Sequence, residues 1–177
     1  MKLKSILLLT SFLILGGLFN VNAQQQSRPR QSPKITTTGK IGDANMTITY
    51  GSPAVKGRKI WGELVPFDKV WRAGANEVTQ IETDKDLVVE GKKLPAGKYS
   101  LYTIPGEKTW QVIFNSQTGQ WGIERSGETT RNPEKDVIVV AVKPSQSVLL
   151  EENLIYVINN KGLVLKWENL EVPLVIK

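Results

Sequence analysis

Residues 98–115 read KYSLYTIPGEKTWQVIFN. This stretch contains two runs that favour β-strands, Lys98–Ile104 and Trp110–Asn115, joined by a connection that begins with Pro105 and Gly106. Adjacent proline and glycine are typical of a turn, because proline presets one backbone angle and glycine tolerates unusual ones. We therefore expect a β-hairpin here, with the remaining strands added on both sides of it.

Further β-prone runs separated by turns occur on both sides of this hairpin. In Met46–Tyr50, apolar side chains alternate with two threonines, which is the period of a half-buried strand. The pattern predicts an all-β fold, a single-domain antiparallel β-sandwich of about ten short strands with one long ordered loop. The other predicted strands are Thr79–Thr83, Leu87–Glu90, Val137–Val142, Val148–Leu150, Leu154–Ile158, Leu163–Trp167 and Val172–Ile176.

The N-terminus has the parts of a secretory signal peptide, residues 1–23. Two lysines among the first four residues are followed by the apolar run Ile6–Phe19, and Val21–Ala23 resembles a signal-peptidase site. A membrane anchor is the alternative, but the run is shorter than the roughly 20 residues that span a bilayer. We expect an exported bacterial protein, periplasmic or extracellular, with no membrane span after cleavage.

The residues after the predicted cleavage site have a different composition from the rest of the chain. Residues 24–33 are polar and contain prolines and two arginines, so they predict a flexible leader. The sandwich domain is expected at residues 34–177. Cleavage removes two lysines and no acidic residue, which lowers the formal net charge from +6 to +4. The remaining charges are dispersed, so no nucleic-acid partner is expected.

The chain contains no cysteine and no histidine. Disulfides, thiol nucleophiles, zinc sites with thiolate or imidazole ligands, and Ser-His-Asp triads are therefore excluded. Asp84 and Asp86 lack the glycine and glutamate that complete a calcium loop, and we expect them in a solvated turn. No metal site and no cofactor are predicted.

One segment, Ser52–Glu77, does not follow the strand pattern. Its 26 residues lack periodicity, whereas connections in compact domains are about 4 to 6 residues long. Disorder is not expected, because the segment is rich in apolar anchors. An ordered loop fixed to the sheet is therefore predicted. The apolar anchors are Ile60, Trp61, Leu64, Val65, Phe67, Val70 and Trp71.

The polar and aromatic residues of this loop suit a recognition site. Arginine can bind a carboxylate or phosphate through two hydrogen bonds, and tryptophan offers a flat face to a sugar ring. We therefore expect a binding site for a small molecule or glycan with an anionic or carbohydrate group. The candidate ligand-binding residues are Lys56, Arg58, Trp61, Trp71, Arg72, Asn76 and Glu77.

Other interpretations of the same residues are open. Trp61 and Trp71 are also typical of core aromatics, and Arg72 and Glu77 of an internal ion pair, which are commoner than ligand sites. A second loop, residues 116–136, could wall the same cleft or be a mobile insertion.

At this loop the sequence resembles a family of exported bacterial proteins described as domain of unknown function 2911. The resemblance extends from about Ser32 to the C-terminus and implies secretion and a shared fold. The family has no established activity that could be transferred. The matching motifs are Ser52–Pro53, Lys56–Gly62, Leu64–Pro66, Val70–Glu77, Gly91–Gly97 and Trp110–Asn115.

Two other functional classes compete with a binding module. A glycosidase-like hydrolase needs two carboxyl groups about 5 to 10 Å apart, for which Glu63, Asp68 and Glu77 are candidates. Loops often contain acidic residues, so no catalytic residue is assigned. A non-catalytic structural or interaction protein of the cell envelope would instead use exposed sheet faces or the edge near Pro173.

Overall fold

The computed structural model describes residues 29–177, which contain ten β-strands and one short 3-10 turn, η1, at Pro133–Lys135. The predicted signal peptide and residues 24–28 of the predicted leader lie outside the described residues. Within the described part of the chain, no helix is long and apolar enough to cross a membrane.

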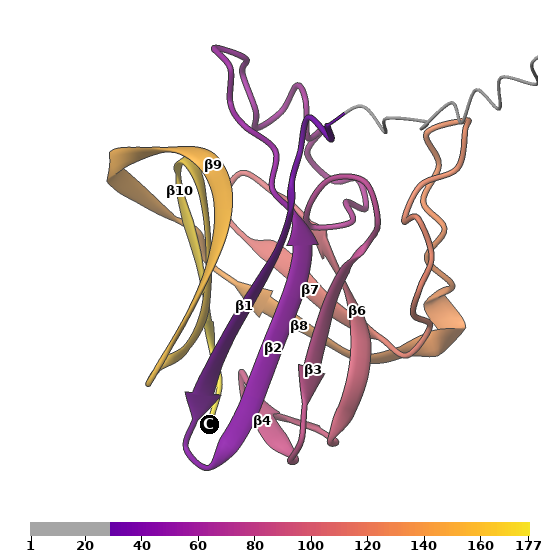
Figure 1. Ribbon diagram of the computed structural model, residues 1–177, viewed down its shortest axis with the longest axis vertical. Coiled ribbons are helices and arrows are strands. Elements are labelled where there is room, and N and C mark those ends of the chain that lie inside the picture. Colours follow the sequence, from indigo (N-terminus) through magenta and orange to yellow (C-terminus); the bar gives the residue numbers. More distant parts are fainter. Residues whose placement is uncertain (1–28) are drawn as a thin grey trace, which may run out of the picture.

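Six strands form the main antiparallel sheet, in the order β1-β2-β3-β6-β7-β8 (Figure 1). The predicted hairpin is confirmed at its centre, where Leu101 pairs with Phe114 and Tyr102 with Ile113. The predicted alternation in β2 is also confirmed, since its apolar side chains are buried and its threonines are half-buried. The strand bounds are β1 Lys34–Ile41, β2 Ala44–Gly51, β3 Thr79–Thr83, β6 Gly97–Ile104, β7 Trp110–Asn115 and β8 Asp136–Val142.

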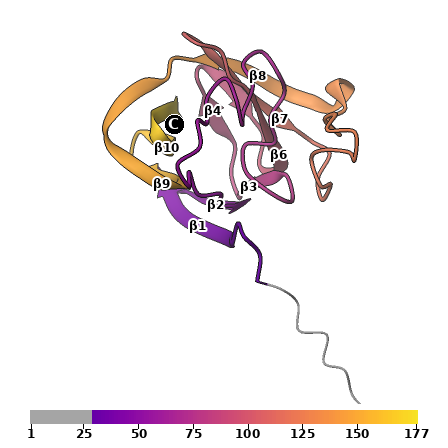
Figure 2. The ribbon, with the colours of Figure 1, turned by 90° about the horizontal axis from the view of Figure 1, so that it is seen from above.

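The second layer consists of β9, Ser145–Asn159, paired with β10, Gly162–Val175, and of the small hairpin β4, Leu87–Val89, with β5, Lys92–Leu94. The backbone of Val88 exchanges two hydrogen bonds with Lys177, which ties the small hairpin to the chain end. Figure 2 shows β9 as a wide arc on one side of the molecule, with β6, β7 and β8 on the other.

The core lies between these two layers, and four tryptophans gather within it. Trp61 packs edge-to-face on Trp110 and Trp167, with ring centroids 4.9 and 5.7 Å apart. Trp110 and Trp167 are almost completely buried. Aromatic rings bury more apolar area than other side chains, so this cluster is a large part of the packing between the layers. The prediction of an all-β sandwich is therefore confirmed.

Some strands differ from the expected ones for a physical reason. β1 and β5 were not predicted as strands, because most of their side chains are exposed and no apolar alternation results. Four predicted strands are parts of the two long strands β9 and β10. Shifts of register interrupt the pairing of these strands and with it the alternation of buried residues.

The segment 52–77 crosses one end of the sandwich between β2 and β3 (Figure 1). Its backbone pairs with both layers, through bridges from Ala54 to Asn153 and from Trp71 to Thr103. Ile60, Trp61 and Val65 are buried. The segment is therefore an ordered loop attached to the sheets.

Candidate ligand-binding pocket

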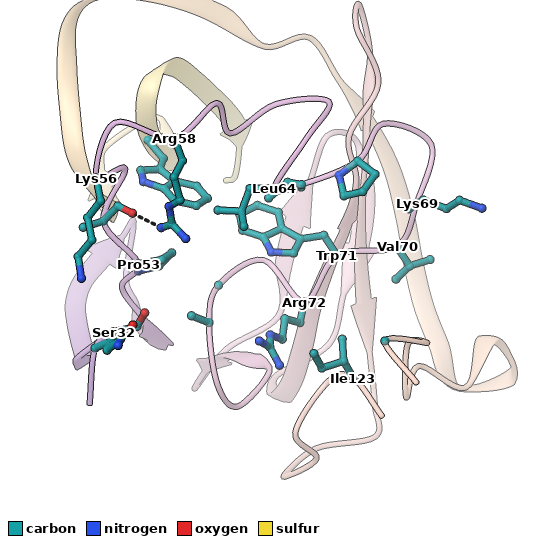
Figure 3. A pocket seen from close by; sticks show the side chains of 18 residues that line it. Ser32, Pro53, Lys56, Arg58, Leu64, Lys69, Val70, Trp71, Arg72 and Ile123 are labelled. Carbon is teal, nitrogen blue, oxygen red and sulfur yellow. Dashed lines mark hydrogen bonds between the residues drawn. The ribbon is translucent and has the colours of Figure 1, made fainter. Parts of the chain in front are cut away.

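A pocket of about 360 Å³ lies at the end of the sandwich that this loop crosses (Figure 3). Most of its lining comes from the loop 52–77, and the rest comes from three other segments. These are Gln31 and Ser32 before β1, Ile123 and Gly127 in the second loop, and Trp167 of β10. The site is thus assembled from parts of the chain that are far apart in sequence.

The aromatic part of the lining is a stacked pair, Trp71 and Trp167. Their ring centroids are 6.0 Å apart and their planes differ by 18°. Trp71 is held in place by two backbone hydrogen bonds with Thr103, of 2.7 and 2.9 Å. Among the described residues, no acceptor binds the buried indole N–H of Trp167. The pair forms a rigid aromatic surface with one half-buried ring, that of Trp71.

Four cationic residues line the pocket beside this aromatic pair: Lys56, Arg58, Lys69 and Arg72. In Figure 3 the side chain of Lys69 points outward from the rim of the pocket. None of the described residues that line the pocket is acidic. The side chain of Arg58 is fixed by its own loop, where it donates hydrogen bonds to the carbonyl oxygens of Val55 and Ala54. The pocket therefore has a positive potential that favours anions.

Arg72 is the most enclosed of these cations. Its guanidinium lies 6.0 Å from the ring centroid of Trp121, and Nη1 donates to the carbonyl oxygen of Trp121 at 3.4 Å. Burial lowers the pKa of Arg72, and the negative charge of Glu77 acts in the opposite direction. Within residues 29–177 Arg72 forms no ion pair. The predicted alternative of an Arg72–Glu77 ion pair is therefore absent from the structure.

Three of the seven candidate residues lie outside the pocket lining. Trp61 is 8% exposed and belongs to the aromatic core. The side-chain amide of Asn76 donates to the carbonyl oxygen of Ser32 at 3.0 Å. Glu77 accepts two hydrogen bonds of 2.8 Å from Arg30. These three residues support the loop and the segment before β1, and the other four line the pocket.

None of the three acidic residues of the loop, Glu63, Asp68 and Glu77, lines the pocket, so they form no catalytic pair there. Glu63 is exposed and pairs with Lys59 at 3.2 Å. The hydrogen bond from Arg30 lowers the pKa of Glu77, whereas a general acid needs a raised pKa. In the described part of the chain, no three potential metal ligands lie together.

The second loop, residues 116–136, forms one wall of the pocket. Ile123 and Gly127 line the pocket, and Gly122 packs closely against Arg72. A Cβ atom built on Gly122 would lie 2.8 Å from that of Arg72. The sequence does not determine the position of this loop, and it does not predict that Trp167 lines the pocket. Neither residues 116–136 nor the strand that contains Trp167 has a local pattern that indicates a contact with the loop 52–77.

Comparison with known proteins identifies one matching family. The family model described as "Protein of unknown function (DUF2911)" matches residues 32–176. All of the pocket lining except Gln31 lies within the matched range. No curated protein and no solved structure matches the chain.

Proposed function

The chain belongs to the DUF2911 family, a family of unknown function, and we propose that it is an exported binding module for an anionic ligand. One observation supports this proposal above the others. Four cationic residues line the same pocket as the stacked pair Trp71 and Trp167, with no acidic residue among the described lining residues. The ligand should therefore combine a negative group with a flat or apolar part.

The two arginines suit the negative group. A guanidinium binds a carboxylate or phosphate through two parallel hydrogen bonds, which fixes orientation as well as charge. Arg58 and Arg72 each already donate to backbone carbonyl oxygens, so their side chains are partly ordered before a ligand arrives. Preordering reduces the entropy lost on binding.

Trp71 suits the flat part of the ligand. Its ring is half-buried and supported from behind by Trp167, so a ligand can reach one part of it without moving the core. An acidic saccharide has both required features, a carboxylate for the arginines and a ring for the indole. The predicted signal peptide is consistent with a glycan found outside the cytoplasm.

The proposal is tested by thermal unfolding of the purified product of the full sequence. A ligand that binds the native state raises the midpoint temperature of unfolding. Acidic oligosaccharides should therefore raise this temperature, and neutral oligosaccharides of the same length should not. The variant Arg72→Gln should lose this stabilisation while keeping its β-sheet circular dichroism. Lys143→Gln, at an exposed lysine outside the pocket lining, is the matched control.

Two results would contradict the proposal. One is equal stabilisation by acidic and neutral saccharides. The other is an Arg72→Gln protein that responds to acidic saccharides as strongly as the unmodified protein.

A further inference from the structure

A short part of β9 leaves its ladder and projects from the molecule. Glu151 of β9 pairs with Glu168, and Gln146 pairs with Leu170. Residues 147–150, which we call the arch, therefore lie opposite a single residue of β10. The hydroxyl of Ser147 accepts a hydrogen bond from the backbone N–H of Leu149, which shapes the turn. The arch belongs to the wide arc of β9 in Figure 2.

The arch exposes three consecutive apolar side chains. Val148 is 101% exposed, Leu149 69% and Leu150 59%. A strand with one buried face would hide every second side chain, so exposure of all three in a row is not a result of the sheet pattern. Contiguous exposed apolar residues are typical of a surface that binds a partner.

Acidic groups lie beside this apolar tip. Glu151 and Glu168 are directly opposed on neighbouring strands, and neither forms an ion pair within residues 29–177. Glu152 follows in sequence and accepts a hydrogen bond from the backbone N–H of Lys56. Like charges opposed across a ladder are unfavourable unless a cation joins them. The complementary partner is thus both apolar and cationic, which disfavours an anionic lipid surface.

The candidate ligand-binding pocket is both apolar and cationic. Leu64, Val70 and Trp71 are apolar and at least partly exposed, and Lys69 and Arg72 contribute positive charge. We propose that a second copy of this chain is the partner, with the arch of each copy seated in the pocket of the other. Val148, Leu149 and Leu150 would cover the apolar walls, and Glu151 would face the cations.

The arch and the pocket are close enough for such an exchange. The backbone N–H of Val55 donates to the carbonyl oxygen of Glu152 at 2.7 Å, and Ala54, which lines the pocket, is bridged to Asn153. This pairing holds the base of the arch at the rim of its own pocket. A two-fold axis near the rim would place each arch over the opposite pocket, which gives a closed and self-complementary dimer.

This inference goes beyond the proposed function, and the two can fail separately. A monomeric protein that still binds acidic saccharides would refute only the dimer proposal. A dimeric protein that binds no acidic ligand would refute only the proposed function as a binding module. If both hold, an acidic saccharide and the arch compete for one pocket, so saturating saccharide should shift the dimer towards monomer.

The test is to express the full sequence and to measure the molar mass of the purified protein by light scattering over a dilution series. The unmodified protein should be a dimer. The triple variant Val148→Ser, Leu149→Ser, Leu150→Ser should raise the dissociation constant by at least about 100-fold, because three apolar contacts are lost at each site. The control Val175→Ser changes an exposed valine away from the arch and should leave the dimer intact.

Charge reversal gives a second, independent readout. Lys69→Glu and Glu151→Lys should each weaken the dimer, and the double variant should recover part of the loss. A monomeric unmodified protein, or a dimer that survives the triple serine change, would overturn the proposal. Arch-dependent binding of the monomer to neutral lipid vesicles would assign the arch to a membrane and overturn it as well.

Discussion

Arg72 differs from the other basic residues of the pocket in its surroundings. It is half-buried, it forms no ion pair within residues 29–177, and its hydrogen bond to Trp121 is long, at 3.4 Å. A guanidinium in this position has lost part of its hydration, and the nearby carboxylate of Glu77 is hydrogen-bonded to Arg30 instead of to Arg72, so the loss is only partly offset. A bound anion would supply a counter-charge, so Arg72 should matter more for binding than for folding.

Trp71 should contribute to ring recognition but not to charge recognition. The change Trp71→Leu should weaken binding of an acidic oligosaccharide about threefold to tenfold, because the aromatic contact is lost. Binding of inorganic sulfate should stay unchanged. Calorimetric titration with both ligands measures the two effects. Equal losses for sulfate and saccharide would show that Trp71 only maintains the shape of the pocket.

Glu77 should stabilise the fold in a pH-dependent way. Its pKa is lowered in the native state, first by the hydrogen bond from Arg30. The contribution is therefore present above the unfolded-state pKa of about 4.3 and is lost as the pH falls through the lower native value. Because Glu77 is a third exposed, at 32%, the effect at neutral pH should not exceed about 1 kcal/mol.

Denaturant unfolding of Glu77→Gln measures this contribution. The variant should be less stable than the unmodified protein near pH 7, and the difference should vanish in acid. The change Glu107→Gln, at an exposed position, serves as a control. A stability difference that persisted or grew as the pH fell would contradict the assigned role of the Arg30 hydrogen bond.

At the scale of elements, the contact between the second loop and the loop 52–77 shapes the pocket. Gly122 has a positive φ of 93° and approaches Arg72. Gly119, in the same loop, has a similar φ of 87° but open space around it. Both positions strain any other residue, and only the first also presses on Arg72.

This pair of glycines allows a matched experiment. Gly122→Ala and Gly119→Ala should each cost about 1 kcal/mol or more in stability from backbone strain, with the larger cost at Gly122. Only Gly122→Ala should also weaken binding of acidic saccharides. Urea unfolding and calorimetric titration of both variants check this. Unchanged binding in Gly122→Ala would show that the second loop does not position Arg72.

Local patterns were sufficient to predict some elements. The alternation in Met46–Tyr50 and the hairpin around Pro105 depend only on neighbours in sequence, and the structure confirms both. β1 was not predicted, because an edge strand with mostly exposed side chains has no apolar alternation. The extra residues of the arch also interrupt the pattern of β9, so two predicted strands proved to be one.

At the scale of the whole molecule, the pocket depends on contacts that no local pattern indicates. The loop 52–77 was predicted as an ordered recognition segment, and it supplies Lys56, Arg58, Trp71 and Arg72 to the lining. Trp167 reaches the same place only because β10 packs across the main sheet. Long-range packing decides which tryptophans are buried. The sequence alone therefore could not show that Trp61 belongs to the core and Trp71 to the pocket lining.

The central claim is that the pocket binds a ligand that is both anionic and ring-shaped. Tryptophan fluorescence tests this most directly, because Trp71 lines the pocket. Titration with an acidic oligosaccharide should give a saturable change that weakens as salt is added, since salt screens the attraction between charges. The neutral counterpart should give none. A saturable change of equal size with both saccharides would contradict the claim, and so would the absence of any change with either of them.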